Sequence, residues 1–403
     1  MSVTPSTPSH YRVAICGAGP VGQALALLLC RHGVAAEEIV LIDGKTHQQA
    51  QHDARSIALS YGSQQILQSI AAWSAQATPI QQIHVSRRGQ FGRCLISAHD
   101  YQLPALGYVS RYGDIIAPLQ AQVIQTQIMQ HRPLQIQRLQ ESPDQVNLYS
   151  QTGELLHADI VVQAEGGLFG QDPQAEATSS QQQKNYQQTA IVAQVTSSKG
   201  AGHCAYERFT DEGPLALLPQ EDAYALVWCV QHARAAELLA LDEASFLSTL
   251  QRTFGERLGQ FVRASARHHF PLGLQIQADD PSSKRIVRIG NAAQILHPVA
   301  GQGLNLGLRD AATLARLLAK HLIPAQLSPS TAEDISTVLQ QFHQQRRADR
   351  TRTIRLTDYL ARWFIRAPHA AGLQHLLGLG IGALDLIAPA KHALAEQMIF
   401  GQR

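Results

Sequence analysis

The sequence predicts an α/β protein with three parts: a domain that starts with a parallel βαβ unit, a second domain built on an antiparallel sheet, and a helical C-terminal region. Three observations support this prediction. A glycine-rich turn joins an apolar run to a helical pattern near the start, short apolar runs alternate with turns at 189–230, and helical patterns dominate beyond 330. A chain of 403 residues is also long enough for two domains.

The composition is that of a folded protein, because 45% of the residues are hydrophobic and 16% are charged. A net charge of +2 with scattered Lys and Arg gives no indication of nucleic-acid binding. The five cysteines are far apart and lack metal-ligand spacing, so we expect reduced thiols and no metal site. We find neither a signal peptide nor a run of about 18 apolar residues, and therefore expect a cytoplasmic protein.

The first βαβ unit carries a nucleotide-binding pattern. An apolar run at 11–16 leads into GAGPVG, followed by a helical pattern at 21–32 and a second apolar run at 39–42. The glycines of this Rossmann-like turn are Gly17, Gly19 and Gly22. They allow a tight turn and close approach of a pyrophosphate to the helix N-terminus. Asp43, at the end of the second run, can bind both hydroxyls of an unphosphorylated adenosine ribose, as in FAD or NAD.

The segments between this unit and residue 188 are predicted from periodicity. In order, we expect a helix at 63–77, two strands within 80–96, a helix at 115–131, strand-like runs at 134–162, and a polar, exposed loop at 171–188. Arg55 follows the acid-terminated strand. From spacing alone, it is either a phosphate contact or a surface loop charge.

The second half begins with the alternating runs at 189–230, which predict an antiparallel sheet with one buried face. A helix at 243–254 and a strand at 267–274 follow. The segment 288–310, RIGNAAQILHPVAGQGLNLGLRD, then predicts a short strand, a glycine-rich loop, and a helix that opens near Gly303 and runs to about 321. A helix N-terminus in such a loop suits an anionic partner.

The C-terminal region is predicted to be mostly helical at 330–365, followed by an apolar, interrupted tail at 370–401. Leucines in the tail fit one face of a helix. That face either packs on its own domain or docks on a membrane surface or another protein, and the sequence leaves both open.

Three separated stretches give the chain its resemblance to a known family. GAGPVG with Asp43, the Ala-Glu-Gly-Gly stretch at 164–167, and the Gly290-Asn291 stretch with its helix resemble the flavoprotein aromatic hydroxylases of the para-hydroxybenzoate hydroxylase fold. HPVAGQGLNLGLRD is similar to the signature of the ubiquinone-biosynthesis hydroxylases. DARSIALSYGS resembles their second FAD segment. YQLPALGYV, YERFTDEGPLALLP and ALVWC resemble the 2-polyprenyl-6-methoxyphenol hydroxylase branch.

The resemblance implies FAD as cofactor and a role for each motif. Gly17, Gly19 and Gly22 would hold the pyrophosphate, Asp43 the adenosine ribose, and Arg55 the phosphates. Gly290 and Asn291 would contact the ribityl and pyrophosphate region, with Asn291 in place of the family's Asp. Pro298 would lie beside the flavin ring. The backbone N–H groups that would approach the pyrimidine edge of the flavin are those of Gly301, Gln302, Gly303, Leu304 and Asn305.

The family chemistry implies NAD(P)H as a transient reductant and O2 as a substrate. Reduced flavin would form a C4a-hydroperoxide that an electron-rich phenol attacks, and water must be kept out. Oriented donors at a helix start would stabilise negative charge on the reduced ring. Glu165 and Gly166 occupy the motif that contacts both FAD and the nicotinamide cofactor in relatives. Glu165 replaces the usual Asp and is one methylene longer, so the contact that serves reduction by NAD(P)H is either kept, shifted or lost.

No residue stands out as a general base. Several histidines are candidates for a pocket position, and His297 is the best because it precedes Pro298. We expect His297 and Pro298 to act mainly by positioning.

The predicted domain boundaries are discontinuous. Residues 1–75, 100–170 and 280–345 form the FAD-binding domain, residues 76–99 and 186–279 the substrate domain, and residues 346–403 the C-terminal helical region.

The expected function is hydroxylation of a polyprenylated phenol in ubiquinone biosynthesis. Other pathway proteins or a membrane surface are candidate partners for the tail. Two alternatives stay open: a hydroxylase of a small soluble aromatic compound, and a flavin-binding assembly subunit with weak catalysis.

Overall fold

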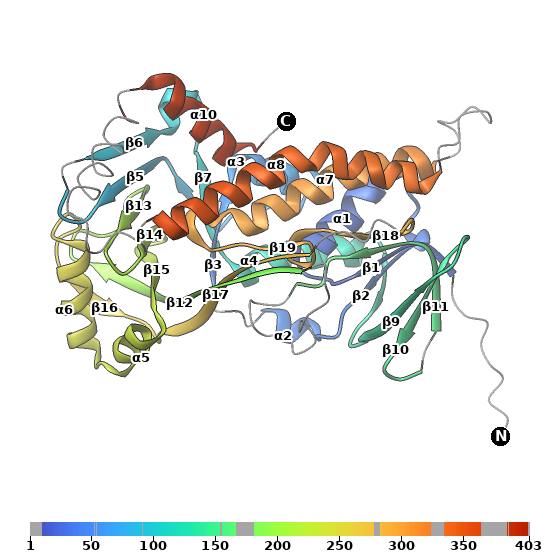
Figure 1. Ribbon diagram of the computed structural model, residues 1–403, viewed down its shortest axis with the longest axis horizontal. Helices are drawn as coiled ribbons and strands as arrows, with labels where there is room; N and C mark the ends of the chain where they lie inside the picture. Colours follow the sequence, from blue (N-terminus) through green and yellow to red (C-terminus); the bar gives the residue numbers. More distant parts are fainter. Residues whose placement is uncertain are drawn as a thin grey trace.

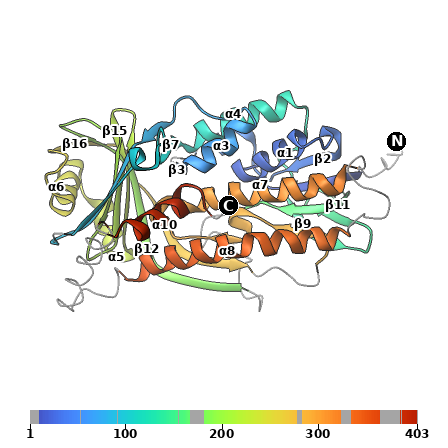
Figure 2. The same cartoon turned by 90° about the horizontal axis from the view of Figure 1, so that it is seen from above.

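The computed structural model describes residues 10–401, except 52, 54, 91, 154, 167–180, 278–282, 324–333, 364–384 and 386. Three β-sheets organise these residues, and the molecule is elongated (Figure 1). A seven-stranded sheet lies at one end and a nine-stranded sheet at the other, with a three-stranded sheet between them. Helices α7 (Gln302–Leu322) and α8 (Ile335–Trp363) run side by side along the long axis in both views (Figure 2).

The seven-stranded sheet contains the expected βαβ unit. Its strand order is β8 (Met129–His131), β2 (Ile39–Ile42), β1 (His10–Cys16), β11 (Leu155–Gln163), β10 (Val146–Ser150) and β9 (Ile136–Glu141), and β18 (Ile286–Arg288) also pairs with β11. The strands from β8 to β11, and β18, are parallel, whereas β9 and β10 form an antiparallel extension. The carboxyl ends of β1, β2 and β11 therefore meet at one edge, where ligands of parallel sheets bind.

Helices cover one face of this sheet. α1 (Pro20–Arg31), α4 (Tyr112–Gln125) and α7 bury a continuous core against it, including Ile15 and Leu314, which are 0% exposed. α1 and α7 pack closely on each other although α7 begins 271 positions after the end of α1. This packing brings the N-terminal glycine motif next to the start of α7.

The nine-stranded sheet forms the second domain. Its strand order is β19 (Gln294–Ile295), β17 (His268–Gln277), β12 (Gln181–Ser197), β15 (Ala223–Gln231), β14 (Pro214–Gln220), β13 (Cys204–Phe209), β5 (Gln82–Arg87) and β6 (Arg93–Ser97), with β16 (Phe261–Ala264) paired to β12. All pairs are antiparallel except β13 with β5. α5 (His232–Ala240) and α6 (Glu243–Phe254) cover one face, where Trp228 and Phe246 are fully buried.

Smaller elements join the two large sheets. β3 (Ser56–Ser60), β7 (Gly107–Arg111) and β4 (Thr78–Ile80) form the three-stranded sheet. In sequence, α2 (His47–Gln51) precedes β3 and α3 (Tyr61–Ser69) follows it. α10 (Ala388–Ile399) packs Ala395 and Ile399 against Cys94 and Ile96 of β6, so this part of the tail lies on the chain's own second domain. Among the described residues, no helix is both long and apolar enough to cross a membrane.

The structure corrects three of the expected elements. The helix expected at 115–131 is α4, which ends at Gln125; Gln127 has a positive φ of 61°, and the chain turns into strand β8. The helix expected at 63–77 is α3, which ends at Ser69, because Ala71 takes a φ of 53°. The loop expected at 171–188 contains the start of β12, since polar glutamines at 181–183 pair with β17.

Other expectations are confirmed. The strand at 39–42 and the helix at 243–254 match β2 and α6, and the glycine-rich segment does open a helix at Gln302. The loop residues 171–180 and the tail residues 370–384 lie outside the described residues, and the domain boundaries remain predictions.

Candidate FAD site

The GAGPVG turn is built so that two of its glycines cannot carry a side chain. Gly17 has a φ of 109°, and a Cβ on it would lie 2.5 Å from the Glu165 backbone nitrogen. A Cβ on Gly22 would lie 1.8 Å from the Gly17 carbonyl oxygen. Gly19 differs, because the nearest atom to its Cβ position would be the Tyr112 hydroxyl at 3.7 Å. Gly17 and Gly22 thus close the turn, while Gly19 presents an open backbone to a ligand.

Asp43 lies at the end of β2, beside this turn. Its Oδ2 accepts a hydrogen bond from the Ala18 backbone N–H at 2.7 Å, and its Oδ1 accepts one from the Lys45 N–H at 2.7 Å. The guanidinium of Arg132 lies 3.8 Å from Oδ2. These contacts hold the carboxylate at the carboxyl edge of the sheet, and each oxygen keeps a lone pair for a ribose hydroxyl.

The second and third motifs meet at the same edge. A Cβ on Gly166 would lie 2.2 Å from the Asn291 Cβ, so the two motifs are in direct contact. Gly290 has a φ of 59° and lies against Val21 of GAGPVG, as does Gly307. The structure therefore brings together the three stretches that the sequence predicted to share one cofactor.

The start of α7 lies next to this cluster. Gly301 caps the helix with a φ of 59° and lies against Ala58 of β3. Among the described residues, no atom lies within 4 Å of a Cβ position on Gly303, so the first turn has an open side. Gln302 is buried and Leu304 packs on the core beside α1. Because the first N–H groups of a helix lack intrahelical partners, this open turn can donate to an anionic edge.

Asn305 has a different role from the one expected of its neighbours. Its side-chain Oδ1 accepts hydrogen bonds from the Ser60 N–H at 2.8 Å and the Ser63 hydroxyl at 2.7 Å. Its Nδ2 donates to the carbonyls of Ala58 and Gly301. The side chain therefore ties α7 to β3 and α3, and a cofactor contact by Asn305 would have to come from its backbone.

Arg55 is held near Gly19 by residues that the sequence did not single out. Its guanidinium forms a bidentate pair with Asp53, with Nη2 2.6 Å from Oδ2. It also lies 5.4 Å from the ring centre of Tyr112. Burial raises the pKa of Tyr112 to about 12, so its hydroxyl is neutral and can donate a hydrogen bond beside Gly19. Arg55 is thus an ordered group, although its positive charge is already paired.

Glu165 follows β11 and is exposed at the edge of the sheet. The atoms packed around its carboxyl, and then the negative charge of Asp43, raise the pKa of Glu165 to about 7. Solvent at this exposed position reduces the shift. At neutral pH the side chain therefore carries less negative charge than an ordinary glutamate.

His297 is buried rather than poised for proton transfer. Its side chain is 1% exposed, its Nδ1 accepts from the Val299 N–H at 3.2 Å, and its Nε2 lies 3.2 Å from the Gln188 Oε1. Since Nδ1 accepts, Nε2 carries the proton and donates to Gln188. Burial lowers the pKa of His297 to about 3, so it stays neutral. This geometry favours the expected positioning role for His297 and for the half-buried Pro298 that follows it.

The cradle fits FAD, because the glycine turn is open at Gly19, the acid is held beside it, and α7 opens on the same side. Residues 10–348 match the FAD binding domain family. The chain belongs to this family. Ubiquinone hydroxylase UbiL of Rhodospirillum rubrum is 31% identical over 407 residues, covering 96% of this chain and 89% of UbiL. The 3-demethoxyubiquinol 3-hydroxylase of Escherichia coli is 30% identical over 322 residues, covering 77% of this chain and 80% of that enzyme.

Solved structures agree on the fold of this flavoprotein. PqsL, a probable FAD-dependent monooxygenase from Pseudomonas aeruginosa, superposes with a TM-score of 0.72 at 18% identity, covering 93% of this chain and 99% of PqsL. The protein is therefore an FAD-dependent aromatic monooxygenase, which confirms the resemblance of its sequence to the flavoprotein aromatic hydroxylases. Use of NAD(P)H and O2 is typical of this family.

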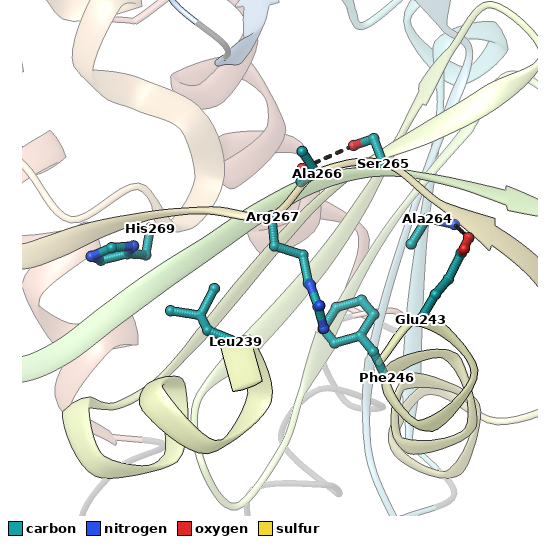
Figure 3. Close-up of a pocket in the computed structure, with 8 residues that line it drawn as sticks. All are labelled: Leu239, Glu243, Phe246, Ala264, Ser265, Ala266, Arg267 and His269. Atoms are coloured by element: carbon teal, nitrogen blue, oxygen red, sulfur yellow. Dashed lines mark hydrogen bonds between the residues drawn. The ribbon is translucent and has the colours of Figure 1, made fainter. Parts of the chain in front are cut away.

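A pocket of about 470 Å³ on this monooxygenase lies away from the cradle, between α5, α6 and the strands β16 and β17 (Figure 3). Arg267 lies over the Phe246 ring (Figure 3). Its guanidinium donates to the carbonyls of Leu238 and Leu241 at the end of α5. Arg267 thus caps a helix end there. His269, one of the histidine candidates, lines this pocket, whereas the predicted FAD-binding residues do not.

Proposed function

We propose that the protein hydroxylates the aromatic ring of a polyprenylated phenol, of the 2-polyprenyl-6-methoxyphenol kind, in ubiquinone biosynthesis. The observation that carries this proposal is the convergence of the three motifs on one cradle, with Gly166 in contact with Asn291 and Gly290 in contact with Val21. The similarity to two ubiquinone-pathway hydroxylases over most of their length supports the substrate class.

The chain's own residues have distinct parts in this proposal. Gly17, Gly19 and Asp43 bind the adenosine diphosphate half of FAD, and the start of α7 donates N–H groups to the flavin. Bound FAD, once reduced by NAD(P)H, supplies the activation of O2 in the way expected from the resemblance. His297, fixed between Gln188 and Val299, holds Pro298 at the flavin. Water must be kept from the activated oxygen, and we expect the antiparallel sheet beside the ring to exclude it.

The substrate class can be tested by varying the prenyl chain. FAD-loaded protein is given NADH or NADPH and a series of 2-prenylphenols with decreasing chain length, and products are identified by mass spectrometry. The proposal expects a hydroxylated product whose kcat/KM falls as the chain shortens, because each isoprene unit buries further apolar surface. Equal or better turnover of phenols without a prenyl chain would favour a small aromatic substrate instead.

A further inference from the structure

Glu207 lies on β13, in the stretch YERFTDEGPLALLP that resembles the prenylphenol hydroxylase branch. Side chains alternate along a strand, so Glu207 shares a face with Phe209, whereas Tyr206 packs toward α6 against Phe254. Phe209 packs with Val299 and Leu360. The carboxyl of Glu207 therefore points to the side of the sheet on which the His297–Val299 segment lies.

The residues beside Glu207 leave this face partly open. Glu207 pairs with Val85 on β5 and with Ala216 on β14, and Ala216 pairs with Val227 on β15. Directly paired residues share a face. All four are only half-buried although they lie in the middle of a nine-stranded sheet, whereas Leu217 on the opposite face is fully buried. The neighbours of the Glu207 carboxyl on this face of the sheet are therefore small or apolar side chains.

One carboxyl oxygen of Glu207 accepts no hydrogen bond from the described residues. The Oε1 atom of Glu207 is buried and has no hydrogen-bond partner among the described residues. An unpartnered buried carboxylate oxygen is costly, so such a group calls for a donor from outside the protein.

The hairpin that carries Glu207 is fixed to the proposed flavin side of the site. Gln188 accepts from the His297 Nε2 and donates its own Nε2 to the Glu212 carbonyl, in the turn between β13 and β14. Glu207 and Phe209 are two residues apart, about 7 Å along the strand. Because Phe209 packs with Val299, Glu207 lies two residues along β13 from the segment that contains Pro298.

We propose that Glu207 accepts a hydrogen bond, and then the proton, from the phenolic hydroxyl of the substrate. The O–H bond of the phenol breaks and a carboxyl O–H bond forms on Glu207. The electron pair stays on the phenolic oxygen, which makes the ring a better nucleophile toward the activated oxygen. The inference rests on the proposed function, because it requires a phenol as substrate.

The electrostatic surroundings suit this exchange. Burial raises the pKa of Glu207 to about 7, so the carboxyl can hold and release a proton near neutral pH. Burial, and then the negative charge of Glu207, raise the pKa of the Cys229 thiol. Arg87 shares the face two residues beyond Val85, but its guanidinium lies 3.4 Å from Asp211.

The test compares a phenol with its methyl ether on FAD-loaded protein. Binding of 2-prenylphenol and of 2-prenylanisole is followed from about pH 6 to about pH 8 by the change in flavin absorbance, and turnover of the phenol is measured alongside. Wild-type protein should bind the phenol roughly tenfold more tightly at the higher pH, with no such trend for the ether. Glu207→Gln should remove this trend, lower kcat by about 100-fold, and leave ether and FAD affinity unchanged. Glu207→Asp should restore part of the rate.

The exposed Glu221, which pairs with Arg111, gives the matched control Glu221→Gln, and this variant should behave as wild type. Equal pH trends for phenol and ether in wild-type protein would overturn the role of Glu207, even if Glu207→Gln failed to fold. A Glu207→Gln variant with wild-type rate and pH trend would overturn it as well. If neither ligand binds and no phenol is hydroxylated, the proposed function itself fails, and the role of Glu207 with it.

Discussion

Gly166 and Asn291 are in direct contact, although 125 positions separate them: a Cβ on Gly166 would lie 2.2 Å from the Asn291 Cβ. Gly166 follows β11, and Asn291 lies in the turn after β18. These two strands are parallel neighbours, so their carboxyl ends deliver both residues to the same edge. The contact places the middle motif of the family against its C-terminal motif, with no room for a side chain between them.

Gly166→Ala should therefore weaken both the fold and the cofactor site. The new methyl group must push Asn291 away, and overpacking of this kind costs about 1–3 kcal/mol. We expect a lower midpoint in urea unfolding of the FAD-free protein and at least a roughly tenfold weaker FAD affinity by fluorescence titration. Adding Asn291→Gly should recover stability. Unchanged stability of the single variant would contradict this tight contact.

Gly303→Ala separates cofactor placement from folding. A Cβ on Gly303 meets no atom of the described part of the chain within 4 Å, so the FAD-free protein should keep its stability. If the flavin edge lies against the first turn of α7, the methyl group should lower FAD affinity by about tenfold or more. Gly202→Ala is the matched control and should bind FAD normally, because its Cβ would also meet no described atom within 4 Å. Normal FAD affinity in Gly303→Ala would place the flavin elsewhere.

A buried charge network joins α7 to α8. Asp310 is 0% exposed and accepts from Arg346 Nε at 2.7 Å and from Arg350 Nη2 at 3.0 Å. Burial alone would raise the pKa of Asp310, but the two arginines outweigh it and hold that pKa below its usual value. Asp310 therefore stabilises the fold above its unfolded pKa, and this contribution is lost as the pH falls through the lowered value.

Removing the charge of Asp310 should be costly. Asp310→Asn removes a carboxylate charge from two buried guanidinium groups, although Arg346 keeps Asp349 and Arg350 keeps the Arg288 carbonyl. We expect a loss of about 3 kcal/mol in the free energy of unfolding, measured in urea at neutral pH. Glu221→Gln breaks an exposed ion pair and should cost less than about 1 kcal/mol. A similar small loss in both variants would show that the network contributes little.

Glu165→Asp tests the departure from the family pattern. An aspartate carboxyl has a lower ordinary pKa than a glutamate carboxyl, so it should carry more negative charge here at neutral pH. We expect FAD affinity within about twofold of wild type and a rate of flavin reduction by NAD(P)H raised by about tenfold, in anaerobic stopped-flow measurements. Glu37→Asp, at an exposed position, serves as control. An unchanged rate would mean that Glu165 supports reduction as it stands.

The sequence predicted the cofactor cradle because its parts are local patterns. GAGPVG, Asp43 and the start of α7 each sit at a strand end or helix start, and parallel pairing brings strand ends together. The predicted C-terminal ends of α3 and α4 were wrong. These helices end before Ala71 and Gln127, which have a positive φ although neither residue is a glycine. The start of β12 was predicted as a loop because it consists of polar glutamines. Backbone pairing with β17 makes this segment a strand despite its polar composition.

Other parts of the site depend on contacts between distant residues. Tyr112, beside Gly19, comes from a helix start that no motif marks. The side chain of Asn305 binds β3 and α3, and Gln188 binds His297 across 109 positions. The role proposed for Glu207 depends on the sheet register, which shows that its side chain lies on the same face as Phe209. Such pairings follow from tertiary packing, which periodicity does not contain.

We propose that this flavoprotein inserts one atom of O2 into the ring of a polyprenylated phenol. To test this, FAD-loaded protein is incubated with NAD(P)H, a 2-polyprenyl-6-methoxyphenol and heavy-isotope O2, and the product is determined by mass spectrometry. We expect a phenol that carries one additional, labelled hydroxyl oxygen. Reductant consumed with only hydrogen peroxide formed, or a product whose new oxygen comes from unlabelled water, would contradict it.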